Sequence, residues 1–388
     1  ECFIPSEIVK VEQLTDTEID KLYSKYQGQT GKVVLQSCGA ENFESGGGTE
    51  RVTSVIANEL VKKNFDVRII SCQHGNSCKF EIDKNIKLYS LNGEKCENSA
   101  LRKIYVEKQL IKYVKEEQID IMIAVDVALY LYLIPLQIKK ICKCIAWEHF
   151  NYYISPNKLV KYARKLAAEH ADCVVVLGKN DLNNYLTQYK YCKNVTYIYN
   201  PIAVDTSEST PLTQKRAIAV GRLSRQKGFD MLVEAWALIE KEVPDWKLDI
   251  YGQGPLQKEL QGQIDGLGLR NIELKGFSDD IHKEYMESSL FFLSSRYEGF
   301  VLVLMEAMAT GLPAVSFRCK EGPEETIDNG INGYLVEEGN VQQFADCAIK
   351  LMKNETLLKQ FASKTKKDLD RFNTAAIINQ WVELLRNM

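Results

Sequence analysis

The stretch Lys32-Val-Val-Leu-Gln-Ser-Cys38 is an apolar run with no polar alternation, which is typical of a strand buried on both faces of a sheet. A glycine-rich loop follows at 45–51, and Thr49–Lys63 then shows helical periodicity. Asp66–Cys72 is strand-like again. A strand, a loop, an amphipathic helix and a second strand make a βαβ unit, so this stretch predicts an α/β fold with a doubly wound parallel sheet.

The same alternation continues to residue 199 and restarts at residue 216. Further strands are predicted at Ile86–Ser90, Asp120–Val125, Cys144–Glu148, Cys173–Leu177, Val195–Tyr199, Arg216–Val220, Trp246–Tyr251, Asn271–Lys275, Leu290–Leu293, Ala314–Phe317 and Gly333–Val336. Helices are predicted between the strands, notably at Ala100–Glu117, Lys158–His170, Lys179–Gln188, Phe229–Lys241 and Leu256–Leu267. Each half of the chain therefore predicts its own Rossmann-like sheet.

The chain has 388 residues, which is more than a single hydrophobic core usually serves, so two domains are expected. Asn200-Pro201 predicts a linker, because the residue before a proline disfavours helix. We expect an N-terminal extension at 1–30, a first Rossmann-like domain at 31–201, a second at 202–371 and a C-terminal helix at 372–388. In the extension, a capping box at 15–18 predicts a short amphipathic helix.

The composition is that of an ordinary globular enzyme, with 45% hydrophobic and 26% charged residues, and it argues against disorder. The apolar runs are too short to cross a bilayer, and residues 1–30 lack the apolar core of a signal peptide. The eleven cysteines are scattered, which favours reduced thiols in a cytoplasmic protein. Cys142 and Cys144 have no partner pair, so no metal site is expected.

The charge is uneven along the chain. Residues 31–200 carry 24 Lys and Arg against 18 Asp and Glu, whereas residues 201–388 carry 22 against 28. A basic first half indicates anionic partners on that side, although a chance distribution of surface charge explains it equally well.

Glycines and cations gather in the loops that follow the predicted strands. The loop Ser45–Arg51 contains three consecutive glycines, and Gly47 and Gly48 are candidates for contact with a phosphate or an acceptor. The alternative is a tight turn. This loop matches neither the dinucleotide fingerprint nor the P-loop, which disfavours an NAD dehydrogenase. In the loop at 221–228, Arg222 and Lys227 suit a diphosphate, and the alternative is a solvated charged loop.

Later loops add further candidates. Gly252 and Gly254 could admit a flat base or a sugar, although a β-α turn often needs glycine for itself. Phe277 follows the strand at 271–275 and is included among the donor-binding candidates. Gly322-Pro323 begins a helix and leaves backbone N–H groups free to meet phosphate or sugar hydroxyls.

Two glutamates and one histidine carry the strongest chemical signal. Glu298 and Glu306 are separated by seven residues, and Glu306 lies in an apolar helical stretch where a carboxylate is costly without partners. Ribose hydroxyls would supply such partners, and a structural salt bridge is the alternative. His149 ends a strand, so it is expected to face the crevice where such sheets bind ligands; the alternative is a core histidine.

Together these motifs resemble the family 4 retaining glycosyltransferases of the GT-B fold. The resemblance covers roughly 31–388 and is strongest over 217–338, where Ser294–Pro313 looks like the family signature almost throughout. It implies two facing Rossmann-like domains with the active site in the cleft between them and a C-terminal helix that crosses back to the first domain. Two features depart from the family: the extension at 1–30 and Val301, which stands where a small residue or proline is common.

The resemblance also implies roles for individual residues. Arg222 and Lys227 would hold the donor diphosphate, and Glu306 would bind the ribose. Glu298, with the backbone near Gly299, Phe300 and Val301, would contact the donor sugar, and His149 would contact the sugar or the reacting region.

The implied activity is retaining transfer of a hexose or N-acetylhexosamine from a nucleotide sugar to a glycan or lipid-linked acceptor, in surface polysaccharide or glycoconjugate synthesis. UDP is the expected nucleotide by family frequency. No cofactor, no metal and no nucleic-acid partner is expected. The alternatives are a sugar-nucleotide epimerase or phosphorylase on the same fold, or a non-catalytic protein that binds glycan or nucleotide.

A peripheral position at the inner face of a membrane is also expected. The predicted helix at 158–170 carries Lys158, Lys161, Arg164 and Lys165 beside apolar residues. A basic amphipathic helix of this kind can lie on anionic lipid. A solvated helix face that packs its apolar side on the sheet is the equally favoured alternative.

Overall fold

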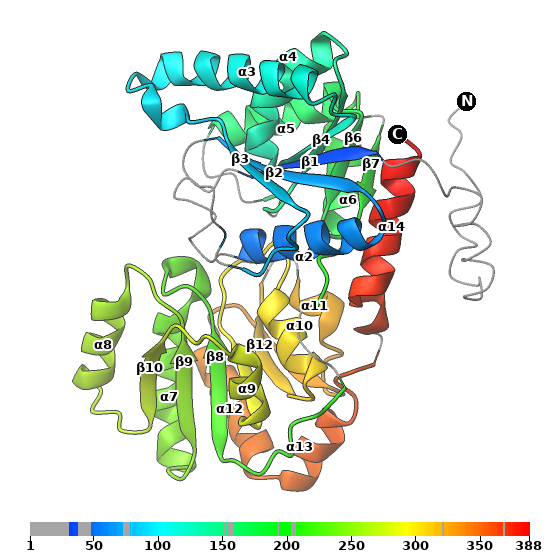
Figure 1. The fold of residues 1–388 in the computed structure, drawn as a ribbon. Coiled ribbons are helices and arrows are strands. Elements are labelled where there is room, and N and C mark those ends of the chain that lie inside the picture. The colour runs from blue at the N-terminus through cyan, green and yellow to red at the C-terminus, as the bar shows by residue number, and fades with distance from the viewer. Residues whose placement is uncertain are drawn as a thin grey trace, which may run out of the picture.

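The structure is a computed structural model that describes residues 31–37, 48–72, 78, 80–150, 152–153, 158–192, 194–202, 207–319, 322–367 and 369–388. The helix predicted after the capping box and the candidate Gly47 lie outside the described residues. Two parallel sheets lie one above the other, each with helices packed around it, and α14 runs along one side of the first (Figure 1). The predicted α/β class with two Rossmann-like sheets is confirmed.

The first sheet has the strand order β3-β2-β1-β4-β5-β6-β7, with all neighbours parallel. Its strands are β1 (Lys32–Ser37), β2 (Asp66–Ser71), β3 (Lys87–Ser90), β4 (Ile121–Val125), β5 (Lys143–Trp147), β6 (Cys173–Val176) and β7 (Val195–Tyr197). Its helices are α2 (Gly48–Lys62), α3 (Ser99–Glu116), α4 (Tyr130–Ile138), α5 (Lys158–His170) and α6 (Lys179–Gln188), with the short turns η2 (Gly93–Lys95) and η3 (Val127–Leu129).

The second sheet has the order β10-β9-β8-β11-β12-β13 and is also parallel. Its strands are β8 (Arg216–Val220), β9 (Lys247–Tyr251), β10 (Ile272–Gly276), β11 (Leu290–Leu293), β12 (Ala314–Arg318) and β13 (Gly333–Glu337). The helical segments are η4 (Arg225–Lys227), α7 (Phe229–Glu242), α8 (Gln257–Gly266), α9 (Ile281–Met286), α10 (Leu302–Ala309), α11 (Pro323–Thr326), α12 (Val341–Met352), α13 (Glu355–Ala362), η5 (Leu369–Phe372) and α14 (Thr374–Arg386).

Strand β1 shows why its sequence has no polar alternation. Val33, Val34 and Leu35 are all fully buried. Val33 and Leu35 pack into one apolar cluster and Val34 into another on the opposite face, because successive side chains point to opposite faces of a strand. The apolar run is therefore explained by helices that cover both faces of the sheet.

The strand order reverses direction once in each sheet, between β1 and β4 and between β8 and β11. The loops that leave the carboxyl ends of such neighbouring strands diverge to opposite faces and leave a crevice for ligands. Helix α2, which begins at Gly48, follows β1 in the chain, and the loop with Arg222 and Lys227 follows β8. The described part of each candidate anion site is therefore next to a switch-point strand.

The C-terminal helix α14 belongs by contact to the first sheet. It contacts α2, and the Trp381 ring lies 4.8 Å from the ring of Trp147 at the end of β5. The chain passes between the sheets at two neighbouring points, since Ile202 N donates to Phe372 O at 2.9 Å. Thr374 Oγ1 adds a hydrogen bond of 3.2 Å to Ile202 O.

Candidate active site

Loops from the carboxyl ends of the two sheets touch one another. Arg51, on the helix that follows β1, forms an ion pair with Glu306, on the helix that follows β11. The Tyr199 ring just beyond β7 stacks on Phe300 with a centroid separation of 5.7 Å. The two sheet edges at which the site residues were predicted are therefore in contact with each other.

The loop after β8 carries the predicted diphosphate cations. Arg222 is exposed and forms no side-chain ion pair with any residue that the structure describes. Lys227 ends η4, and its aliphatic stem lies across Gly221, with Cδ and Cε each 3.1 Å from where a Cβ on Gly221 would be. Arg222 is therefore available to an anion, whereas Lys227 already has a fixed position.

Lys227 is fixed by the first glutamate of the pair. Its Nζ lies 2.6 Å from Glu298 Oε1, and the same oxygen accepts a 2.5 Å hydrogen bond from Ser295 Oγ. Ser294 Oγ donates to Lys227 O at 2.8 Å. The cation loop after β8 and the glutamate loop after β11 are thus tied together, and Glu298 holds the ammonium of Lys227 close to the sugar-contact candidates that follow it.

Gly252 and Gly254 pack against the cation loop. Gly252 has φ +140°, and a Cβ there would lie 1.9 Å from Gly221 O. A Cβ on Gly254 would lie 2.3 Å from Leu223 O. These glycines give the two loops room to lie backbone to backbone, and only glycine fits so close an approach.

Glu306 is buried, with a side chain that is 3% exposed, and its Oε1 lies 2.9 Å from Arg51 Nη1. Burial raises the pKa of Glu306, and the positive charge of Arg51 opposes that rise. The salt bridge that the sequence left open as an alternative therefore exists. Its partner comes from the other domain, and a carboxylate with one salt bridge still has lone pairs for hydroxyl donors.

His149 lies two residues beyond the carboxyl end of β5. Its ring packs on Trp147 at 4.3 Å between centroids, and its Nε2 is enclosed without a hydrogen-bond partner among the described residues. Burial lowers the pKa of His149 to about 3, so the ring is neutral at neutral pH. A neutral imidazole suits a hydrogen bond to a sugar hydroxyl better than transfer of a proton from an imidazolium.

A buried charged network supports the loop that carries His149. Glu148 Oε2 pairs with Arg164 Nε at 2.6 Å and accepts a hydrogen bond of 3.1 Å from Tyr185. Glu148 Oε1 accepts from Phe150 N at 3.1 Å. Burial raises the pKa of Glu148 to about 7 although Arg164 opposes the rise.

This network corrects one expectation. Arg164 was predicted to lie on an exposed basic face of α5, but its residue is only 1% exposed and it is turned inward to Glu148. The buried carboxylate at the end of β5 is the reason, since it needs a cation.

The remaining donor candidates differ in exposure. Phe277 follows β10 and is 48% exposed, whereas Phe300 is half-buried against Tyr199 and Phe372. Gly299 is half-buried beside it. Val301, the departure from the family pattern, is buried against Gly322, whose φ is +98° and where a Cβ would lie 2.5 Å from Val301 Cγ2.

The described residues contain neither a cluster of metal-ligating side chains nor a membrane-spanning helix. In that part of the chain, no three His, Cys, Asp or Glu side chains gather as metal ligands would. None of its helices combines the length and apolar character that a bilayer-spanning helix needs.

Both halves of the chain match known families. Residues 204–368 match the family described as Glycosyl transferases group 1, and residues 46–206 match Glycosyltransferase Family 4. An uncharacterized glycosyltransferase of Haemophilus influenzae is 33% identical over 349 residues, which span 89% of this chain and 98% of that protein. The chain belongs to the family 4 glycosyltransferases. The resemblance seen in the sequence is thus confirmed, and the protein is a glycosyltransferase.

Other relatives agree with this assignment. The amylovoran biosynthesis glycosyltransferase AmsD of Erwinia amylovora is 30% identical over 363 residues, spanning 89% of this chain and 97% of AmsD. Among solved structures, Anabaena HepE in complex with UDP and glucose superposes with a TM-score of 0.79 at 19% identity, over 92% of this chain and all of that one. TarM of S. aureus superposes with a TM-score of 0.76 at 18% identity, over 92% of this chain and 99% of that one. These two structures share the GT-B fold with this glycosyltransferase.

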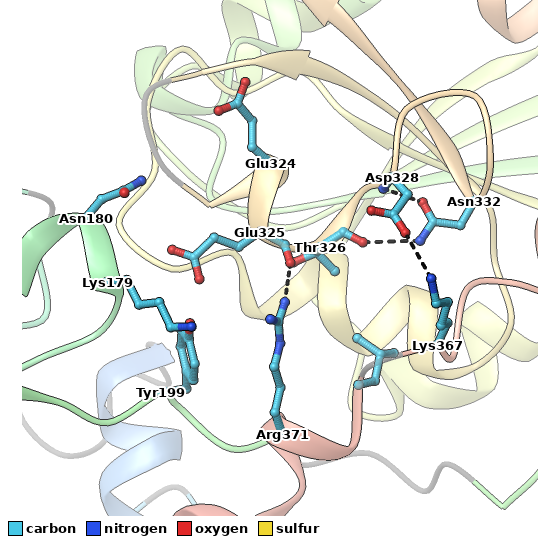
Figure 2. A pocket seen from close by; sticks show the side chains of 11 residues that line it. Lys179, Asn180, Tyr199, Glu324, Glu325, Thr326, Asp328, Asn332, Lys367 and Arg371 are labelled. Carbon is cyan, nitrogen blue, oxygen red and sulfur yellow. Dashed lines mark hydrogen bonds and ion pairs between the residues drawn. The ribbon is translucent and has the colours of Figure 1, made fainter. Parts of the chain in front are cut away.

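A polar pocket of about 340 Å³ lies between the domains of this glycosyltransferase, next to α11. Figure 2 shows Lys179, Asn180 and Tyr199 on one side of it and the Glu325 side chain projecting toward them from α11. A Cβ on Gly178, at the start of α6, would lie 3.0 Å from Glu325 Oε1. Glu325 therefore joins the helix that begins at Gly322-Pro323 to the first domain.

Sequence reasoning assigned no role to Arg51 or Glu325 in this glycosyltransferase. Arg51 was part of the glycine-loop motif, and its position on the first turn of a helix at a switch point could have marked it as facing the cleft. Glu325 had no such signal, because its partner Gly178 offers only a helix N-terminus that no motif marks.

Proposed function

We propose that this enzyme transfers a hexose or N-acetylhexosamine from a UDP-sugar, with retention of anomeric configuration, to a glycan or lipid-linked acceptor in surface polysaccharide synthesis. The observation that carries the proposal is that the switch points of the two sheets meet through the Arg51–Glu306 ion pair, while Lys227–Glu298 ties the loop with Arg222 to the loop after β11. AmsD is an amylovoran biosynthesis glycosyltransferase, which supports a polysaccharide product. The UDP and glucose bound in HepE support the donor class.

In the proposed donor pose, residues of the second domain bind the nucleotide. Phe277 is an exposed aromatic ring at the sheet edge, suited to stack on a base. Arg222 would bind the diphosphate through its forked guanidinium and Lys227 through a point charge. Glu306 would accept hydrogen bonds from the ribose hydroxyls.

The proposed chemistry is a front-face displacement. The bond between the anomeric carbon and the diphosphate oxygen breaks, and the acceptor oxygen forms its bond to that carbon on the same face. The leaving phosphate oxygen takes the acceptor proton. Arg222 and Lys227 stabilise the charge that develops on the leaving diphosphate, so catalysis rests on positioning and electrostatics rather than on a metal.

His149 would act in this scheme as a neutral hydrogen-bonding group for the donor sugar. Its partly buried ring carries no positive charge at neutral pH, and the enclosed Nε2 has no partner among the described residues. A sugar hydroxyl would supply that partner, because a buried polar atom is costly when unpaired.

The exposed face of α5 supports a peripheral membrane position. Lys158, Lys161 and Lys165 are exposed there together with Leu159 and Tyr162, which are 55% and 56% exposed. Cations beside apolar side chains on one helix face suit the surface of anionic lipid. A cytoplasmic enzyme would reach a lipid-linked acceptor through this face.

A nucleotide panel followed by product analysis tests the proposal. UDP and UDP-sugars should raise the thermal midpoint more than GDP, ADP or their sugars, because a ligand that binds only the native state stabilises it. The sugar transferred from an α-linked donor should remain α-linked by NMR. A free, epimerised nucleotide sugar formed without acceptor would favour the epimerase alternative, and an inverted linkage would refute retention.

A further inference from the structure

A cation from the first domain pairs with the carboxylate to which we assign the donor ribose. Arg51 Nη1 lies 2.9 Å from Glu306 Oε1, and the two side chains are 29% and 3% exposed. Arg51 lies on α2 after β1, whereas Glu306 lies on α10 after β11. The pair therefore links the switch points of the two sheets.

Helix packing places this pair. A Cβ on Gly48 would lie 3.9 Å from Leu302 Cδ1, so the start of α2 lies against the start of α10. Gly48 and Arg51 are three residues apart, and Leu302 and Glu306 are four apart, so each pair shares one face of its helix. The first turns of α2 and α10 are therefore within van der Waals reach of each other, and Arg51 meets Glu306 one turn further along.

The pair also decides the ionisation of the carboxylate. Burial raises the pKa of Glu306, and Arg51 is the group that lowers it. Tyr285 on α9 also faces the pair, and burial, followed by the charge of Glu306, raises the pKa of its hydroxyl. A buried carboxylate that loses its cation becomes strongly unfavourable as an anion, and an ionised carboxylate accepts hydrogen bonds that a protonated one cannot match.

We propose that Arg51 is a positioning residue of the nucleotide site, which orients Glu306 as the acceptor for the donor's ribose hydroxyls and so makes full nucleotide affinity depend on contact between the two domains. The inference rests on the proposed donor, because the ribose belongs to the nucleoside diphosphate. It assigns to the first domain a part of nucleotide recognition that acts through a residue of the second.

Calorimetric titration of UDP and of 2′,3′-dideoxy-UDP tests the inference. Wild-type protein should bind UDP about tenfold more tightly than the dideoxy analogue, since one good hydrogen bond to a charged group has about that value. Arg51→Ala should weaken UDP binding about tenfold but leave the analogue within about twofold of wild type, because the analogue never used Glu306. Arg51→Lys should recover part of the lost affinity.

Two controls separate this role from a structural one. Lys62→Ala removes an exposed cation from the same helix and should bind both ligands like wild type. In a Glu306→Gln background, Arg51→Ala should cause no further loss of UDP affinity, because the coupling runs through Glu306. Thermal unfolding of each variant establishes that it is folded.

The outcomes are distinguishable. Equal weakening of UDP and the analogue by Arg51→Ala, or no weakening of either, would overturn the inference and leave the proposed donor intact. Wild-type protein that does not bind UDP would contradict the proposed donor and the inference together.

Discussion

Glu298 and Glu306 are both buried carboxylates, and each is matched by one cation from a different part of the chain. Lys227 forms an ion pair with Glu298 within the second domain, and Arg51 of the first domain forms an ion pair with Glu306. Removal of one member of a buried pair leaves an uncompensated charge, which is far more costly than loss of the whole pair. Arg222, by contrast, is exposed with no ion-pair partner in the described residues, so its removal costs the native fold little.

This difference gives the first prediction. Arg222→Ala and Lys227→Ala should each weaken UDP binding by about 1.5–3 kcal/mol, as expected for charge-assisted hydrogen bonds. Only Lys227→Ala should also lower the thermal midpoint, because it removes the cation that pairs with the buried Glu298 carboxylate. Calorimetry and thermal unfolding measure the two effects, with Lys258→Ala, an exposed cation on α8, as the matched control. Unchanged UDP affinity in both variants would remove the diphosphate assignment.

The second prediction concerns the imidazole of His149, which is partly buried and has an enclosed Nε2. Burial depresses the pKa of His149 from 6.5 to about 3 in the folded state, so the unfolded chain binds a proton there that the native chain does not. The native state therefore loses stability as the pH falls through the window from about 6.5 toward 3. At pH 5 the loss relative to pH 7 should be about 1–2 kcal/mol from this residue.

Urea unfolding of wild type and of His149→Phe at pH 7 and pH 5 measures that contribution. Phenylalanine cannot be protonated and fills a similar volume, so the variant should lose less stability than wild type between the two pH values. Parallel losses would show that His149 is protonated in the folded protein.

Helix α5 has two faces with separate roles. Its inner face turns Arg164 to Glu148 beneath the loop that carries His149. Its outer face exposes Lys158, Lys161 and Lys165 beside Leu159 and Tyr162. The outer cations can therefore be reversed without disturbing the buried pair, which makes the membrane proposal testable at the level of this helix.

The third prediction is that the protein sediments with anionic but not with neutral liposomes, and less so as salt is raised. Reversal of Lys158, Lys161 and Lys165 to Glu should abolish sedimentation, since each cation contributes about 1 kcal/mol near an anionic surface. The matched control reverses Lys353, Lys359 and Lys364, three exposed cations of the second domain, and should still sediment. Absence of binding at low salt would favour a soluble acceptor.

Across the whole molecule, the cations of the proposed donor site come from both domains: two would meet the diphosphate, and the third acts through Glu306. Arg222 and Lys227 belong to the second domain and Arg51 to the first. Neighbouring chain crossings near Ile202 and Phe372 hold the two sheets together on one side of this region. The diphosphate would thus be met by Arg222 and Lys227 of the second domain, while contact with the first domain positions Glu306.

The fourth prediction follows from this distribution of charge. Transferase activity should survive EDTA, because Arg222 and Lys227 supply the charge that a metal would otherwise supply. Activity is measured with and without chelator, and then with added Mg²⁺ or Mn²⁺. Complete loss with EDTA and recovery with metal would contradict the proposed mechanism.

The fold class could be predicted from the sequence because its signals are local. The apolar run without polar alternation at 32–38 indicates a strand that is buried on both faces. The helical periodicity at 49–63 indicates a helix with one buried face. The loops that would carry function could be found for the same reason, since a residue such as Lys227 or His149 is placed at the carboxyl end of a strand by its position in the alternation. The family signature at 294–313 then gave the expected roles.

Only the tertiary structure decided which side chains meet. Arg51 and Glu306 are more than two hundred residues apart, and no periodicity relates them; their pairing follows from the approach of α2 to α10. From the sequence, Arg164 was predicted to be exposed like the neighbouring lysines of the same helix. In the structure its side chain points inward, because it forms an ion pair with the buried Glu148. The apolar and polar pattern of a segment can be read from its own sequence. The ion-pair partner of a buried charge depends on how distant elements pack, and the charge needs that partner because it is buried.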